Sequence, residues 1–139
     1  MRNRIAVLAV AVGMLATAAS AQAFVAKLKA PTHRPHAGKQ WPIKVSAHRK
    51  NGKRVHASAY YQFVYQGQVV QSCKPLPSKP GGRKCNNGTT AGRYHFFGSY
   101  RDVVVWPKKS IGLPLTFRVV VHARHDGTKR LNYAVKVRR

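Results

Sequence analysis

The sequence predicts an all-β protein, and three features of the chain after residue 23 support this fold class. Apolar and polar residues alternate with a period of two in several segments, as in strands that bury one face. No segment there sustains the 3.6-residue repeat of an amphipathic helix. Glycine and proline signals separate the alternating segments at short intervals. We therefore expect an antiparallel β-sandwich of about seven or eight strands, in preference to a closed barrel.

The first 23 residues have the features of a cleaved signal peptide. Arg2 and Arg4 precede an apolar stretch, Ile5–Ala19, and residues 21–23 (Ala-Gln-Ala) place small residues at a cleavage position. A cut two residues earlier is an alternative. The apolar stretch is shorter than the roughly 20 residues that span a bilayer. We predict an exported protein, secreted or associated with the cell envelope, with no transmembrane segment after cleavage.

The remaining residues, 24–139, are expected to form one domain, and most of the alternating segments in it can be assigned to strands. The expected strands are Ala26–Ala30, Pro42–His48, Val55–Tyr65, Gln68–Ser72, Tyr94–Ser99, Asp102–Trp106, Leu115–Arg124 and Arg130–Arg138.

The last two strands form a hairpin whose register can be derived. Opposed residues must share a face, so the numbers of two paired positions must sum to an even number if both apolar sets face inward. A two-residue Asp126-Gly127 turn gives an odd sum, whereas a three-residue loop ending in a left-handed Gly127 gives an even one. The pairs expected from that loop are Val121 with Leu131, Val119 with Tyr133, and Phe117 with Val135.

Cys73 and Cys85 are expected to form an intrachain disulfide, because both lie in the exported part of the chain. The prolines and glycines between them argue against regular structure, so the bridge is expected to close an exposed loop. A reactive thiol or a thiolate metal site is the alternative. Four cations lie in this loop: Lys74, Lys79, Arg83 and Lys84.

One stretch of the sequence resembles a known family. Residues 45–52 (Val-Ser-Ala-His to Asn-Gly), 55–57 (Val-His-Ala) and Phe63 are similar to a pattern of bacterial immunoglobulin-like domains of the invasin type. The segment 115–137 is similar to the last two strands of such domains. The resemblance covers about half of the exported chain and implies an immunoglobulin-like β-sandwich. The cysteine spacing does not match the inter-sheet bridge of antibody domains.

Acidic residues are almost absent: 26 Lys and Arg stand against Asp102 and Asp126, with no glutamate. Chemistry that depends on paired carboxylates, or on a metal held by carboxylates, is therefore excluded. No nucleophile turn of the G-x-S-x-G kind accompanies the histidines. We predict a protein that is not an enzyme and uses no cofactor.

The seven histidines raise the alternative of a copper carrier, since exported immunoglobulin-like copper carriers exist. His33 and His36 have an H-x-x-H spacing, but Pro35 and the neighbouring cations make a ligand pair there unfavourable. His122 and His125 lie near the final turn and are expected to face solvent. No metal site is predicted.

The net positive charge predicts which class of partner the protein binds. Arg2 and Arg4 account for two units of the net charge of +24, so residues 24–139 carry +22. Such a domain attracts anionic polymers or acidic surfaces by counterion release, whereas the export signal restricts nucleic acid to non-specific binding. A purely structural domain whose cations only face solvent is the other alternative. The sequence specifies no particular polymer and no oligomeric state.

The predicted binding residues form two groups. The outward face of the final hairpin is expected to pair Arg124 with Thr128, His122 with Arg130, Arg118 with Ala134 and Thr116 with Lys136, with Arg138 extending the strip. The second group is the set of loop cations Lys74, Lys79, Arg83 and Lys84.

Overall fold

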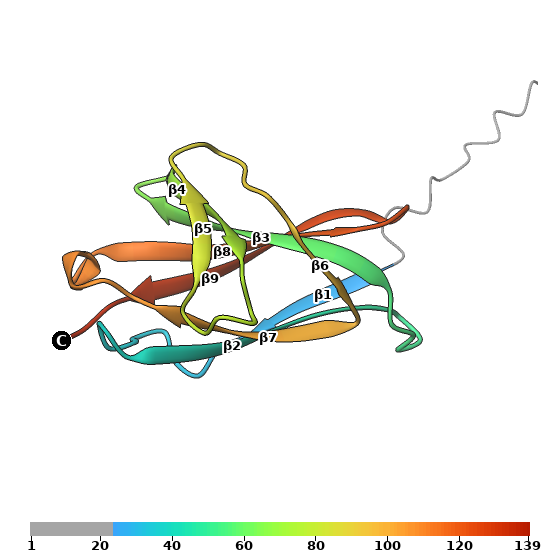
Figure 1. Cartoon of the computed structure of the whole chain (residues 1–139), viewed down its shortest axis with the longest axis horizontal. Helices are drawn as coiled ribbons and strands as arrows, with labels where there is room; N and C mark the ends of the chain where they lie inside the picture. Colours follow the sequence, from blue (N-terminus) through green and yellow to red (C-terminus); the bar gives the residue numbers. More distant parts are fainter. Residues whose placement is uncertain (1–23) are drawn as a thin grey trace, which may run out of the picture.

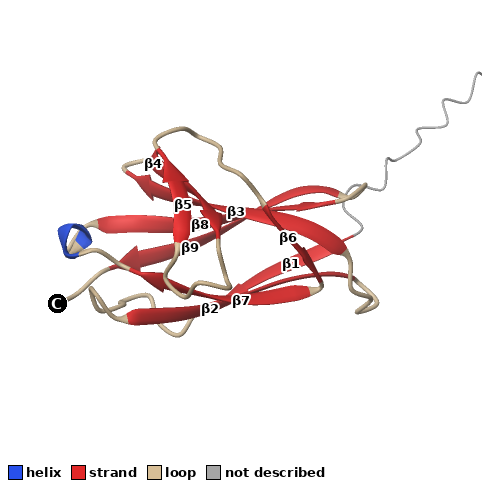
Figure 2. Ribbon diagram, viewed as in Figure 1, coloured by secondary structure: helices blue, strands red, loops and turns tan. Residues whose placement is uncertain are grey.

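The computed structural model describes residues 24–139 and shows two antiparallel sheets that share one hydrophobic core (Figures 1 and 2). The predicted signal peptide, residues 1–23, lies outside the described residues. The strands are β1 Phe24–Lys29, β2 Gln40–Arg49, β3 His56–Tyr65, β4 Gln68–Pro75, β5 Arg83–Asn86, β6 Tyr94–Phe97, β7 Ser99–Val105, β8 Pro114–Ala123 and β9 Gly127–Lys136, with one 3-10 turn, η1, at Lys108–Ser110. Among residues 24–139 no helix has the length and apolar character needed to cross a membrane.

The smaller sheet has the strand order β1-β2-β7 and the larger sheet has the order β5-β4-β3-β8-β9. The two short partners β4 and β6 divide one edge of β3: β6 pairs with its first half and β4 with its second half. The chain then passes from β6 in one sheet to β7 in the other (Figure 1). Gly98 makes this passage with a φ of 78°, a conformation that favours glycine.

Alternation along the strands brings the apolar faces of both sheets into the core, as the sequence predicted. Ile43, Val45 and Ala47 of β2 are all buried. Trp41 of β2 packs edge-on against Phe117 of β8, with 5.6 Å between ring centroids, so the two sheets contact each other directly. The prediction of an all-β, antiparallel fold is confirmed.

The derived register of the final hairpin is wrong by two positions. The loop has three residues, but these are Arg124–Asp126, and Gly127 is the first residue of β9. The expected pairs are replaced by Phe117 with Tyr133, Val119 with Leu131 and Val121 with Lys129. Both registers have even sums and bury the same faces, so parity alone does not choose between them. Contacts outside the hairpin hold its tip: the Arg124 amide donates to the His56 carbonyl, and Asp126 pairs with Arg49.

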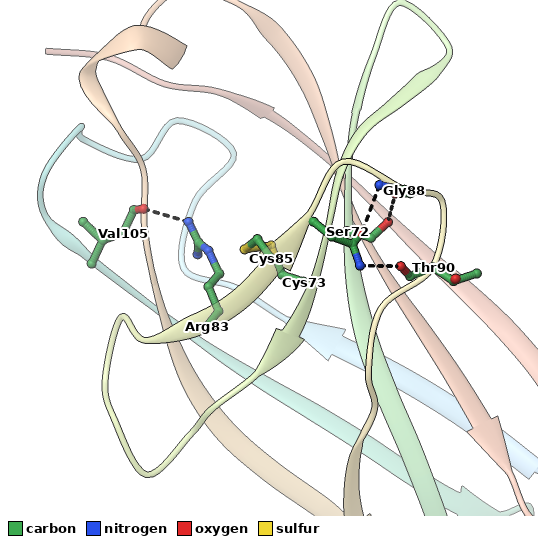
Figure 3. The surroundings of a disulfide bond; sticks show 8 residues. Ser72, Cys73, Arg83, Cys85, Gly88, Thr90 and Val105 are labelled. Atoms are coloured by element: carbon green, nitrogen blue, oxygen red, sulfur yellow. Dashed lines mark hydrogen bonds between the residues drawn. A yellow bond between two sulfur atoms is a disulfide. The ribbon is translucent and has the colours of Figure 1, made fainter.

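The segment between the cysteines contains more regular structure than the sequence predicted. β4 continues to Pro75, and β5 pairs with it so that Cys73 and Cys85 face each other in the ladder and form the disulfide (Figure 3). Pro75 lies at the end of its strand, and the other two prolines lie in the loop 76–82, outside the ladder. Strand ends tolerate proline, which explains why the expectation of a wholly irregular loop was wrong.

An irregular segment, residues 33–37, covers the outer edge of β9. The amides of Lys136 and Arg138 donate to the carbonyls of His33 and Pro35, both at 2.9 Å, and the Ala37 amide donates to the Arg138 carbonyl at 2.8 Å. The backbone groups of this edge are therefore paired near the C-terminus.

Candidate anion-binding surfaces

Both acidic side chains are engaged within the protein. Asp102 is buried and accepts hydrogen bonds from the Tyr61 hydroxyl and the Val103 amide, each at 2.7 Å. Tyr100 in turn donates to the Tyr61 hydroxyl at 3.2 Å. Burial raises the pKa of Asp102, although both of its hydrogen bonds act in the opposite direction. Burial is also the main cause that raises the pKa values of Tyr61 and Tyr100.

The second acid, Asp126, lies 3.7 Å from Arg49, and this is the single ion pair between side chains among residues 24–139. Nearly all cations of the described chain therefore lack a carboxylate partner. Any neutralising charge must come from solution or from a ligand.

The smaller sheet carries a row of three cations on its outer face. Lys29 of β1 lies directly opposite Lys44 of β2, which lies directly opposite Arg101 of β7. Their sequence neighbours Ile43 and Tyr100 face the core, so all three cations point outward. Like charges directly opposite each other on neighbouring strands destabilise a sheet. We call these three residues the cation row.

A groove of about 630 Å³ runs over the cation row. Pro31, Pro42 and Pro77 line it together with the three cations, and Asp102, whose side chain is buried, is also among its lining residues. Pro77 comes from the loop closed by the disulfide, and that loop is attached to β7 by a hydrogen bond from the Gly81 amide to the Val103 carbonyl at 3.2 Å. The disulfide loop therefore contributes to this groove through its backbone and a proline.

The predicted cations of the final hairpin do not form the continuous strip that was expected. Arg118 lies opposite Asn132 and donates to its Oδ1 at 2.7 Å and to Gln62 Oε1 at 3.1 Å. Arg130 lies opposite Val120. The neutral pair Thr116 and Ala134 then separates these two arginines from the far end of the hairpin.

At that far end Lys136 lies opposite Pro114, and Arg138 Nε donates to the Arg34 carbonyl at 3.0 Å. Arg124 is exposed in the turn. The four pairings expected on this face are wrong, because the register of the hairpin differs by two positions from the derived one. These expected pairings are Arg124 with Thr128, His122 with Arg130, Arg118 with Ala134 and Thr116 with Lys136.

Two of the four disulfide-loop cations, Lys79 and Lys84, are exposed, whereas Lys74 and Arg83 are half-buried. Lys74 and Lys84 lie opposite each other in the ladder, and Lys79 is exposed. The guanidinium of Arg83 packs 5.0 Å from the centroid of the Phe63 ring, and its Nη2 donates to the Val105 carbonyl at 3.2 Å (Figure 3). Burial lowers the pKa of Arg83. The expectation of four exposed cations is wrong for Lys74 and Arg83, which are only partly exposed, and the guanidinium of Arg83 is directed toward β7.

The histidines of the H-x-x-H segment are held by main-chain groups. His33 Nδ1 donates to the Ala134 carbonyl and His36 Nδ1 to the Arg139 carbonyl, both at 2.6 Å. His125 is exposed at the hairpin tip. Within residues 24–139 no group of three or more His, Cys, Asp or Glu side chains could hold one metal ion.

Sequence reasoning missed the cation row, although it assigned strands to the segments that carry Lys29 and Lys44. The period-2 pattern marks both lysines as outward-facing, but it does not show that β2 pairs with β7. That pairing is what brings Arg101 beside Lys44.

No protein-family model and no curated protein matches the chain significantly. Among solved structures, it is similar to a DUF4466 family protein from Parabacteroides merdae, with 14% sequence identity and a TM-score of 0.43. The match covers 83% of this chain and 45% of that protein. The chain thus spans less than half the length of this structural neighbour.

Proposed function

We propose that the protein is a secreted, non-enzymatic module with an immunoglobulin-like β-sandwich fold that binds anionic polymers of the extracellular space or the cell envelope. The strand orders β1-β2-β7 and β5-β4-β3-β8-β9 support this fold, because immunoglobulin-like domains of the variable type divide their strands between two sheets in this way, apart from β6, which pairs with β3 here. The disulfide and the predicted signal peptide support export.

The cation row carries the proposal. Strands lie about 4.8 Å apart, so the row places three positive charges across a span of roughly 10 Å. No carboxylate side chain forms an ion pair with any of the three within the described residues. A polymer with regularly spaced negative groups would relieve the repulsion between these cations and release its own counterions on binding.

The test compares two variants of residues 24–139 that have the same net charge. In the first, Lys29, Lys44 and Arg101 are replaced by Gln. In the second, three exposed lysines outside the cation row, the disulfide loop and the final hairpin are replaced by Gln: Lys50, Lys53 and Lys108. Binding to dextran sulfate and to a DNA duplex is measured at several salt concentrations, with thermal melting to verify folding.

We expect the cation-row variant to lose about two to three units from the slope of log affinity against log salt, because each neutralised group contributes roughly 0.7–0.9. The control variant should lose less than one. Equal losses in the two variants would contradict a localised site and leave only general charge attraction. Tighter binding of DNA with a shallower salt slope would favour the nucleic-acid alternative, and no binding at low salt would favour a purely structural domain.

A further inference from the structure

Histidines from two strands flank a small residue on the outer face of the larger sheet. Ser58 of β3 lies directly opposite His95 of β6 on one side and directly opposite His122 of β8 on the other. Two strand spacings separate the histidine Cα atoms by about 9–10 Å. The short serine side chain between two long imidazoles leaves a depression whose floor is Ser58.

This depression belongs to a groove of about 660 Å³, a volume in the range of small-ligand sites. The residues that line it are His56, Ala57, Ser58, His95, Phe96, Phe97, His122 and Arg124. We call it the histidine groove. It lies on the opposite sheet from the cation row, and none of its lining residues is acidic.

The charged groups around the groove are all cationic. Arg124 lines its rim, and Arg54 precedes β3 with its guanidinium 4.9 Å from the centroid of the Phe97 ring. Arg93 precedes β6 and lies over Tyr60, the next outward residue of β3 after Ser58. On β9, Arg130 follows along the same outer face. An anion entering the groove therefore meets positive potential from every neighbouring element.

The Phe97 ring at the groove is partly occupied by its neighbours. Arg54 lies over the ring, and the His56 ring lies 4.6 Å from it between centroids. Phe97 nevertheless remains 46% exposed. The charged and polar side chains of the groove, more than this ring, therefore determine which ligand it can bind.

His122 has a defined orientation. Its Nδ1 lies 2.9 Å from the Thr128 hydroxyl, which leaves Nε2 as the ring atom available to a ligand. When Nδ1 carries the proton of the neutral imidazole, Nε2 can only accept a hydrogen bond, and it becomes a donor once the ring is protonated.

We propose that the histidine groove binds one tetrahedral oxyanion, a phosphate or sulfate ester group, between the imidazoles of His95 and His122 and above Ser58. A tetrahedral group presents oxygens toward both walls, the serine hydroxyl and Arg124 at once, which a planar carboxylate cannot do. The inference rests on the proposed function and names a class of charged group that the polymer would carry.

The test is an NMR titration of residues 24–139, which detects weak binding residue by residue. Dimethyl phosphate and methyl sulfate serve as probes because each carries a single negative charge. We expect shifts centred on Ser58, His95 and His122. Preference for one ester identifies the source of the group, and equal affinity assigns the site to tetrahedral oxyanions in general.

Two variants separate the groove from histidines elsewhere in the chain. Replacing His95 and His122 by Gln should abolish binding of the probes, whereas replacing His33 and His36 by Gln should leave it unchanged. Binding retained by the first variant, shifts centred away from the groove, or equally tight binding of acetate would overturn the inference. The cation-row variant should bind the small probes normally, so loss of its polymer binding would bear on the proposed function alone.

Discussion

The buried contact between Tyr61 and Asp102 joins the two sheets, and replacing Tyr61 by Phe tests how much it stabilises the fold. The Tyr61 hydroxyl comes from β3, whereas Asp102 and Tyr100 come from β7. The substitution removes one oxygen atom and leaves the ring in place. It deletes the hydrogen bond to Asp102 and also the acceptor that Tyr100 uses.

The expected loss follows from these two bonds. A hydrogen bond to a charged group contributes about 1.5–3 kcal/mol and a neutral one about 0.5–1.5 kcal/mol, so the variant should lose about 2–4.5 kcal/mol of unfolding free energy. All three side chains are less than a tenth exposed, so water cannot easily replace the lost partner. Without the Tyr61 hydroxyl the pKa of Asp102 should also rise further, because that bond favours the carboxylate.

Urea unfolding at pH 7 measures the loss, with fluorescence of the buried Trp41 and Trp106 as the signal. Tyr133→Phe is the control, because the hydroxyl of Tyr133 makes no hydrogen bond among the described residues, and it should change stability by less than about 0.5 kcal/mol. A double-mutant cycle isolates the contact between the two residues, and it requires Tyr61→Phe to be made also in an Asp102→Ala background. A loss of the same size there, or a loss below about 0.5 kcal/mol in the native background, would refute the reasoning.

Two further predictions concern the same core and the passage between the sheets. The pKa of Asp102 is raised in the folded state, so its contribution to stability is present at acid pH and is lost as pH rises through the folded pKa. Asp102→Asn should therefore gain stability relative to the native protein over the range that begins near pH 4 and extends upward. Thermal melts across this range check it, and a gain that shrinks with rising pH would contradict it. Gly98→Ala places a Cβ 2.4 Å from Arg54 Cδ at a positive φ, and should lower the unfolding free energy by at least about 1–2 kcal/mol. Adding Arg54→Ser should recover the steric part of this loss in urea unfolding, and no recovery would show that the clash is not the cause.

The final hairpin illustrates how far the sequence determines the fold. Alternation assigns Phe117, Val119 and Val121 to the buried face, and the structure agrees. Alternation does not determine which residues pair across the two strands, because every register with an even sum buries the same residues. Contacts of the hairpin tip with Arg49 and His56 lie far away in the sequence and are not visible in the local pattern.

The candidate surfaces depend on the same kind of long-range information. Lys44 is recognisably an outward-facing residue of a strand, yet Lys29 and Arg101 become its neighbours only through the order β1-β2-β7. His95 and Ser58 are likewise 37 positions apart and meet because β6 pairs with the first half of β3. Composition predicts that anions are attracted, whereas sheet topology decides where the charges converge.

The near absence of acids also explains why the two candidate surfaces can act separately. Asp102 is buried and Asp126 is paired with Arg49, so neither carboxylate forms an ion pair with a residue of the cation row or of the histidine groove. The two surfaces lie on opposite sheets and share no lining residue. Replacing Lys29, Lys44 and Arg101 should therefore leave binding at the groove unchanged, and replacing His95 and His122 should leave binding at the cation row unchanged.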